Sequence, residues 1–206
     1  MSRLIPSLIL ASTSPRRRQL LTQHGYAHDA VKPPLDDGQL VRGRVSAVGW
    51  VASLAWLKAR AVWDTMDKTD RENRVVLAAD TVVHKNDEIL GQPMDRDDAR
   101  RIVGALINGE HRVLTGVCLI GEGERVWFVD RSLVRVGEVS DEQIESYLET
   151  NGWRGKAGGY NLHERIDDGW PIEYQGEDTS IMGLPMHRLA QELARIGIEP
   201  KPEETA

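Results

Sequence analysis

The feature that most constrains the fold is the apolar run at residues 75–79, Val-Val-Leu-Ala-Ala, which is followed by Asp80 and Thr81. A strand that lacks alternation between polar and apolar residues is typical of a sheet covered by helices on both faces. Such sheets belong to the α/β class. The run therefore predicts a central buried strand that ends at Asp80 and Thr81, before Val82 and Val83 resume the apolar pattern.

The start of the chain predicts a strand, a tight turn and a helix. Residues 8–11 form a short apolar run of strand type. Ser14 is a suitable helix cap, and Pro15 suits the first helical position because its missing N–H costs nothing there. Gly25 predicts the end of this helix.

A longer helix is predicted over residues 46–66. Trp50, Leu54, Leu57 and Ala61 recur there at the three- and four-residue spacing of one helical face. Aromatic residues at helical spacing usually mark packing in a core or between subunits. We therefore assign the tryptophans of this helix no catalytic role.

The rest of the chain predicts further helices mixed with hairpins. The glycine-rich residues 155–160 predict a ligand loop, and Ser140 with Gln143 predicts a capping box. We expect a hairpin turn at residues 85–87, helices at 95–106, 140–148 and 186–196, and strands at 112–120, 125–136 and 172–174.

The pattern predicts a mixed sheet within one domain. Strands and helices alternate early in the chain, whereas hairpins intervene later, which favours a mixed rather than a purely parallel sheet. No internal repeat or linker is visible, so residues 1–206 are expected to form a single domain. Its Pro- and Glu-rich end, residues 199–206, is expected to be a frayed tail.

Composition limits the location and the partners of the chain. A net charge of −6 argues against a broad nucleic-acid surface, so a polyanionic substrate would need a local basic cluster. No apolar run is long enough to span a bilayer, and no signal peptide is recognisable, so we expect a cytoplasmic protein without a membrane partner. The single cysteine, Cys118, lies in an apolar stretch and is interpreted as a core thiol.

A basic cluster of this kind follows the first strand. Arg16, Arg17 and Arg18 occupy the first turn of a helix, where the macrodipole disfavours positive charge unless an anion is bound. Backbone N–H groups, the hydroxyls of Ser12 and Ser14 and the guanidinium groups could converge on one phosphate. Three solvated arginines that point in different directions are an equally acceptable interpretation of this segment alone.

Acidic residues offer a metal site. An ionised Asp80 beside a dry strand is costly unless it is paired, hydrogen-bonded or bound to a metal. Asp36 and Asp37 lie in the loop at residues 33–38 and provide oxygens of the type that Mg²⁺ or Mn²⁺ prefers. The alternative for Asp80 is a carboxylate that accepts hydrogen bonds from loop N–H groups. The alternative for Asp36 and Asp37 is an ordinary polar turn.

Two lysines complete the candidate set. Lys58 lies late in the long helix, and Lys156 lies in the glycine-rich loop, where glycines permit close backbone approach to a ligand. Each lysine taken alone would be interpreted as a solvated charge.

Taken together, these segments resemble the Maf family of nucleotide pyrophosphatases, in order and over nearly the whole chain. The pieces that carry the resemblance are LASTSPRR at residues 10–17, LAWLKA at 54–59, ADTVV at 79–83, HRVLTG at 111–116, KAGGY at 156–160 and GLP at 183–185.

The resemblance implies a fold, an assembly and an activity. The expected fold is α/β of the ITPase/Maf-like type, an elongated twisted mixed sheet flanked by helices, with two lobes around a central nucleotide cleft, often as a homodimer. The expected activity is cleavage between the α and β phosphates of pyrimidine or modified nucleoside triphosphates, a house-cleaning role in the nucleotide pool. By position, Asp80 matches the family's catalytic aspartate and Asp37 its loop glutamate, and the phosphate-contacting bases are Arg16, Arg17, Lys58 and Lys156.

The chain departs from the family pattern at two positions. Gln92 stands where the family usually has a lysine before proline, and His163, beside Glu164, stands where the pyrimidine-specific branch has a glutamine. Both residues are assigned to substrate binding, with Ser12, Ser14, Arg16 and Arg17. The arginine pair and Lys156 favour dTTP or UTP, while the altered loop leaves the base preference open.

These assignments lead to a mechanism and a rival. In the mechanism, Asp80 and Asp37 hold a divalent cation, Mg²⁺ or Mn²⁺, that activates water for attack on the α-phosphorus, while Lys58 and Lys156 stabilise phosphoryl charge. The rival is a nucleotide-binding regulator of cell division and septum formation with little turnover. A P-loop phosphotransferase is excluded because no glycine-rich sequence ending in Lys and Ser or Thr is present.

Overall fold

The computed structural model describes residues 6–201 and has the predicted α/β fold with a mixed sheet. Seven strands among these residues form one sheet in the order β2-β1-β3-β5-β6-β7, and β4 pairs with β3. The strands are β1 (Ser7–Ala11), β2 (His28–Val31), β3 (Arg74–Lys85), β4 (Glu88–Leu90), β5 (Gly109–Gly121), β6 (Glu124–Val136) and β7 (Ile172–Gln175).

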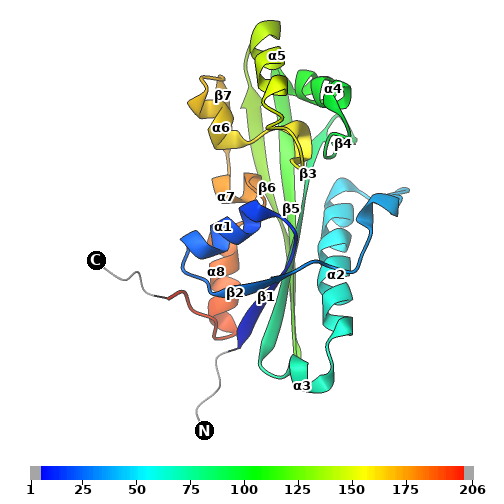
Figure 1. Cartoon of the computed structure of the whole chain (residues 1–206), viewed down its shortest axis with the longest axis vertical. Helices are drawn as coiled ribbons and strands as arrows, with labels where there is room; N and C mark the ends of the chain where they lie inside the picture. Colours follow the sequence, from blue (N-terminus) through cyan, green and yellow to red (C-terminus); the bar gives the residue numbers. More distant parts are fainter. Residues whose placement is uncertain (1–5, 202–206) are drawn as a thin grey trace. The chain divides into compact units, whose positions relative to one another are not determined.

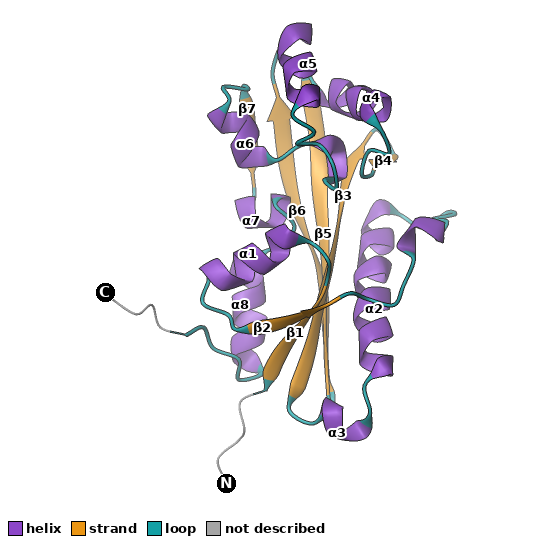
Figure 2. Cartoon of the chain, in the orientation of Figure 1, coloured by secondary structure: helices purple, strands orange, loops and turns teal. Residues whose placement is uncertain are grey.

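Helices of very different length accompany the sheet (Figure 2). The α-helices are α1 (Pro15–Gln23), α2 (Ala47–Thr65), α3 (Lys68–Arg71), α4 (Arg96–Leu106), α5 (Asp141–Glu149), α6 (Leu162–Asp167), α7 (Asp178–Ile181) and α8 (Met186–Arg195). Two 3-10 turns, η1 (Asp37–Gln39) and η2 (Ala157–Gly159), lie in loops.

The chain divides into two compact units. Unit 1 comprises Met1–Asp80, Thr115–Asp130 and Gly183–Ala206, and unit 2 comprises Thr81–Leu114 and Arg131–Met182. Since β3, β5 and β6 cross the boundaries of these segments, each of the three strands contributes residues to both units.

Unit 1 has a parallel sheet segment at its centre. β1 pairs in parallel with both β2 and β3, so the β1–α1–β2 segment is a crossover of the kind found in α/β folds. Figure 1 shows α2 on one side of these strands and α1 with α8 on the other. Covering both faces explains why β3 is apolar from Val75 to Ala79 without alternation.

Helix α2 approaches the sheet closely because Gly116 has no side chain. A Cβ added at Gly116 on β5 would lie 2.5 Å from the carbonyl oxygen of Val51 on α2. Nearby, the small side chains of Ala55 and Ala59 pack with Cys118 in one buried cluster. Burial raises the pKa of the Cys118 thiol to about 11, which agrees with the predicted core thiol.

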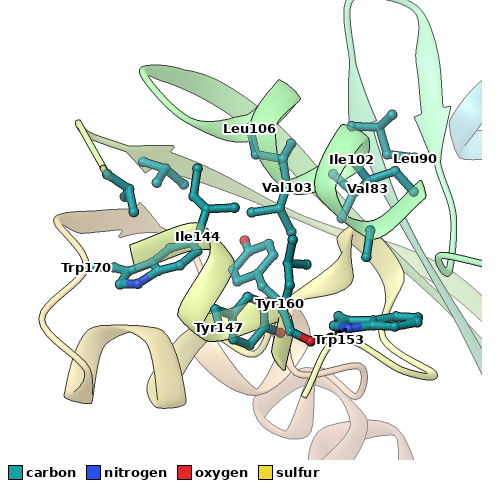
Figure 3. Packing of buried hydrophobic residues seen from close by; sticks show 14 of the residues in the cluster. Val83, Leu90, Ile102, Val103, Leu106, Ile144, Tyr147, Trp153, Tyr160 and Trp170 are labelled. Atoms are coloured by element: carbon teal, nitrogen blue, oxygen red, sulfur yellow. Dashed lines mark hydrogen bonds between the residues drawn. The ribbon is translucent and has the colours of Figure 1, made fainter. Parts of the chain in front are cut away.

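Unit 2 packs helices α4 and α5 together over its own core. Arg96 and Arg100 of α4 both form ion pairs with Glu145 of α5. Beneath the helices lies a hydrophobic cluster rich in aromatic side chains (Figure 3). The aromatic residues of this cluster are Tyr147, Trp153, Tyr160 and Trp170.

Several local predictions are confirmed in detail. The side chain of Ser14 caps α1 by accepting from the N–H of Arg17, and Pro15 occupies the first helical position. Ser140 and Gln143 form the predicted capping box at the start of α5. Asn86 and Asp87, both with positive φ, make the tight turn between β3 and β4.

Two local predictions are wrong. Strand β3 does not end at Asp80 but continues to Lys85, so Asp80 is an interior strand residue. In α2 the most buried face is not the one predicted: Leu54 is buried, whereas Trp50, Leu57 and Ala61 are only partly buried. The buried stripe instead comprises Val51, Leu54, Ala55, Ala59, Val62 and Trp63, with Ala47 at its start.

The described chain ends at Lys201, within the predicted tail. Residues 202–206 of the predicted tail lie outside the described residues, while the backbone N–H of Lys201 donates to Gly25. Within residues 6–201, no helix combines the length and the apolar character needed to cross a membrane.

The close approach of α2 to β5 predicts the effect of a single methyl group. We expect Gly116→Ala to lower the free energy of unfolding by about 1–3 kcal/mol, because the new Cβ meets the backbone of Val51 rather than a movable side chain. Urea denaturation measures this change.

The matched control is Gly104→Ala in α4, where an added Cβ meets nothing within 4 Å. There we expect stabilisation by roughly 0.5–1 kcal/mol, the usual gain for alanine over glycine in a helix. Equal effects of the two substitutions would contradict this account of the packing.

Candidate active site

A single ammonium group joins two of the predicted carboxylates in unit 1. Lys58 Nζ lies 2.5 Å from Asp80 Oδ1 and 2.6 Å from Asp37 Oδ2. The three side chains come from α2, β3 and η1, so residues that are distant in sequence share one cluster. We call Asp37, Lys58 and Asp80 the acid–lysine cluster.

Each member of the acid–lysine cluster is held by its own element. Asp80 is 8% exposed inside β3, and Lys58 projects from the fourth turn of α2. In the loop, Asp36 caps η1 by accepting from the N–H of Gly38 and also accepts from the side chain of Gln39. Asp36 is therefore engaged within its own turn, and Asp37 is the loop carboxylate that reaches Lys58.

The start of α1 forms a second group of predicted residues in unit 1. Arg17 Nε donates to the carbonyl oxygen of Gly183 at 2.9 Å, and its Nη1 donates to Ser12 Oγ at 3.4 Å. Ser12 Oγ also accepts from the N–H of Ser14 at 3.1 Å. Hydrogen bonds thus connect Ser12, Ser14 and Arg17 at the start of α1.

Electrostatics link Arg17 to the acid–lysine cluster. Burial lowers the pKa of Arg17, and the negative charges of Asp80 and Asp37 oppose that shift. Of the other two arginines, Arg16 is partly buried and Arg18 is exposed, so the run at residues 16–18 is neither three solvated side chains nor one uniform cluster.

The acid–lysine cluster fits a divalent cation. Its two carboxylates already converge on one positive charge, and Mg²⁺ typically uses one or two protein carboxylates together with substrate phosphate and water. No group of three or more His, Cys, Asp or Glu side chains within residues 6–201 has the geometry to hold a metal. Asp37 and Asp80, which share Lys58, are the two carboxylates that this site offers to such an ion.

Lys156 lies in unit 2, where it too is paired with a carboxylate. Its Nζ lies 2.9 Å from Glu164 Oε2. The surrounding loop depends on glycine, because Gly155, Gly158 and Gly159 all have positive φ. At Gly158 an added Cβ would also lie 2.6 Å from Val83.

Buried aromatic hydroxyls anchor this loop. Tyr147 Oη donates to the carbonyl oxygen of Gly159 at 2.8 Å, and Tyr160 Oη shares a hydrogen bond of 2.8 Å with His111 Nε2. Burial, with a smaller contribution from the charge of Lys85, lowers the pKa of His111 to about 4, so the imidazole is neutral at pH 7. Figure 3 shows Tyr147 and Tyr160 among the side chains of this core.

The other two predicted substrate residues also belong to unit 2. His163 Nε2 lies 3.3 Å from Asp178 Oδ2 on α7. Gln92 is exposed, and the residue before it, Gly91, accepts from the N–H of Gly158 at 3.0 Å. The segment of Gln92 is thereby tied to the glycine-rich loop.

Sequence reasoning missed the partners of several predicted residues. Glu164, Asp178 and His111 had no assigned role, although each contacts a predicted loop or site residue. The spacing of Lys156 and Glu164 does not predict that their side chains meet, because the two residues do not belong to one helix or strand. A glycine-rich loop and the first residues of α6 lie between them. His111 was visible only as part of the HRVLTG segment.

Comparison with known proteins identifies one family. The family model described as Maf-like protein matches residues 7–196 of this chain.

Several relatives cover most of the chain. A protein named dTTP/UTP pyrophosphatase from Symbiobacterium thermophilum is 37% identical over 190 residues, which cover 92% of this chain and 94% of that protein. Proteins of the same name from Chromobacterium violaceum and Rhodopirellula baltica are 35% and 38% identical and cover 93% and 90% of this chain, and 96% and 80% of their own lengths. The solved Staphylococcus aureus Ham1 protein, at 14% identity and a TM-score of 0.44 over 75% of this chain and 78% of its own, is too distant to bear on function.

The acid–lysine cluster predicts a stability effect of its own. We expect Lys58→Met to lower the free energy of unfolding by roughly 1–3 kcal/mol, because the substitution leaves two neighbouring carboxylates, one of them buried, without their shared donor. Chemical denaturation at low ionic strength measures the change.

Arg60→Met on the same helix is the control. Arg60 forms an exposed ion pair with Asp64 one turn along α2, and such pairs contribute only about 0.3–0.5 kcal/mol. If Lys58→Met has no larger effect than Arg60→Met, the cluster is not a structural unit.

Proposed function

The chain belongs to the family of Maf-like proteins, and from that membership we propose that it hydrolyses nucleoside triphosphates to nucleoside monophosphate and pyrophosphate. The names of the relatives favour dTTP and UTP as substrates and a house-cleaning role in the nucleotide pool. The single observation that carries the proposal is the acid–lysine cluster, which joins three residues that the family resemblance singles out.

In this proposal the residues of unit 1 bind and orient the triphosphate. Arg17 is fixed by Gly183 and Ser12, so its guanidinium is pre-organised to stabilise phosphoryl charge without further ordering. Ser14 and Arg16 add contacts at the start of α1. Lys58 keeps Asp37 and Asp80 at close range, where two like charges would otherwise repel each other.

The proposal includes a divalent metal held by Asp37 and Asp80. When bound, Mg²⁺ or Mn²⁺ would act as a Lewis acid that activates water and neutralises charge on the triphosphate. Water attacks the α-phosphorus, the bond between this atom and the α–β bridging oxygen breaks, and pyrophosphate leaves with that oxygen. The chain's own task is to position water and phosphate and to balance their charges.

We assign supporting roles to three residues of unit 2. Lys156 stabilises negative charge on phosphate oxygens, and its anchored loop limits the ordering that binding requires. His163 and Gln92 contact the substrate and determine which base the enzyme prefers. The candidate bases are pyrimidines and modified bases. We keep residues 1–206 as a single catalytic domain.

The family resemblance also suggests an assembly and a location. We propose that the protein is a homodimer in the cytoplasm and that it binds a nucleoside triphosphate as its substrate. We propose no nucleic-acid or membrane partner. The runner-up function is a nucleotide-binding regulator of cell division with little turnover; the glutamine at position 92, in place of the family's lysine, favours it.

Product analysis with dTTP tests the proposed reaction. We expect dTMP and pyrophosphate in equal amounts from the wild type. Asp80→Asn and Asp37→Asn should each lower kcat/KM by about a hundredfold or more, the usual loss when a group that stabilises the transition state is removed. Separate assays for pyrophosphate and orthophosphate measure both products.

Asp36→Asn is the matched control, since it changes the neighbouring carboxylate and leaves an oxygen to cap η1. It should retain most of the activity. Release of orthophosphate from the γ position, or full activity of Asp80→Asn, would contradict the proposal, and tight nucleotide binding without turnover would favour the regulator.

A further inference from the structure

Lys156 enters the proposed reaction as a phosphate contact, although its charge is already paired. The Lys156 and Glu164 side chains are 26% and 45% exposed, so their ion pair is accessible to solvent. A polyphosphate that reaches Lys156 would meet a carboxylate 2.9 Å from the ammonium. Glu164 must therefore affect how strongly Lys156 attracts an anion.

Glu164 is held by a second donor. Asn161 Nδ2 donates to Glu164 Oε1 at 2.7 Å, while Lys156 contacts the other oxygen, Oε2. Both oxygens of the carboxylate are thus engaged. A side chain fixed at two points keeps its charge in place better than a surface glutamate with a single partner.

The orientation of Asn161 serves this contact rather than its helix. Asn161 is the N-cap residue of α6, where asparagine usually accepts a backbone N–H, but it makes no side-chain cap bond. Asn161 is 6% exposed, and its Oδ1 is buried without a hydrogen-bond partner. Turning the amide to satisfy Oδ1 would place an oxygen against the carboxylate, so the contact with Glu164 determines the orientation.

The helix that carries Glu164 is itself anchored to the core of unit 2. The guanidinium carbon of Arg165, the next residue, lies 4.0 Å from the ring centroid of Tyr147 and 5.4 Å from that of Trp170. Arg165 also forms an ion pair of 2.7 Å with Asp168. With Lys156 on a loop anchored by Tyr147, both partners of the ion pair project from restrained backbone.

We infer that Glu164 is a built-in competitor for polyphosphate: it acts through Lys156 to weaken the binding of triphosphate and pyrophosphate anions. The inference rests on the proposed role of Lys156. A negative charge held beside the phosphate-binding lysine repels an incoming anion and must be displaced or shared before Lys156 can bind. Weaker binding of the anion alone also favours release of the pyrophosphate product.

Calorimetric titration with inorganic triphosphate tests this inference on the full chain at low ionic strength. Glu164→Gln and Glu164→Ala should each tighten binding about three- to tenfold, the range expected from a partly exposed ion pair. The gain should shrink as salt is added. The alanine variant excludes a new hydrogen bond from the glutamine amide, and a merely structural role of Glu164 would weaken binding instead.

Two further variants make the test specific. In a Lys156→Met background, Glu164→Gln should have little effect, because the competitor acts only through the lysine. Glu110→Gln is the matched control, since Glu110 is an exposed glutamate of unit 2 that pairs with Arg135 at 2.6 Å. This control should bind triphosphate as the wild type does.

The possible outcomes separate this inference from the proposed function. If Lys156→Met weakens binding but both Glu164 variants bind like the wild type or more weakly, the competitor role is overturned and the phosphate contact of Lys156 stands. If Lys156→Met binds like the wild type, the phosphate role of Lys156 fails, and the competitor role fails with it.

Discussion

The ammonium group of Lys58 between the carboxylates of Asp37 and Asp80 is the interaction on which the rest of the site depends. Two carboxylates that both lie within 2.6 Å of one nitrogen atom are close enough to repel each other unless a cation lies between them. Helix α2 supplies that cation, and it packs close to the sheet because Gly116 leaves room for its backbone. The packing of unit 1 therefore has a direct chemical consequence.

Both lysines singled out by the sequence are paired with carboxylates, Lys58 with Asp37 and Asp80, and Lys156 with Glu164. In a chain with a net charge of −6, this arrangement keeps strongly basic groups from attracting anions indiscriminately. For a pyrophosphatase, moderate attraction is useful, because the enzyme must bind a triphosphate and then release a highly charged product. Positioning then contributes more to the reaction than net charge does.

The sequence predicted best where local chemistry decides the outcome. The cap at Ser14, the box at Ser140 and Gln143 and the turn at Asn86 and Asp87 depend on residues a few positions apart, and all of them are present. Asp80 is conspicuous in the sequence because a charge is unusual in an apolar run. The same charge misleads about the strand, because it suggests a strand end at Asp80, whereas β3 continues to Lys85.

Tertiary contacts explain what the sequence could not predict. Elements β2, α3, α6 and α7 have four to six residues, too few for a hydrophobic period to be recognised. Which face of α2 is buried depends on the strand residues that the helix packs against. The buried face includes Val51 and Ala55, whereas the spacing favoured the face that includes Trp50. Likewise, nothing in the spacing distinguishes Asp37, which reaches Lys58, from Asp36, which caps its own turn.

In the proposed reaction, Asp37 and Asp80 share one divalent cation in addition to the lysine that joins them. Paramagnetic resonance of Mn²⁺, titrated into the protein with a dTTP analogue that carries a methylene bridge between the α and β phosphates, tests it most directly. We expect one tightly bound Mn²⁺ per wild-type chain and its loss in both Asp37→Asn and Asp80→Asn. Undiminished Mn²⁺ binding in these two variants would contradict it.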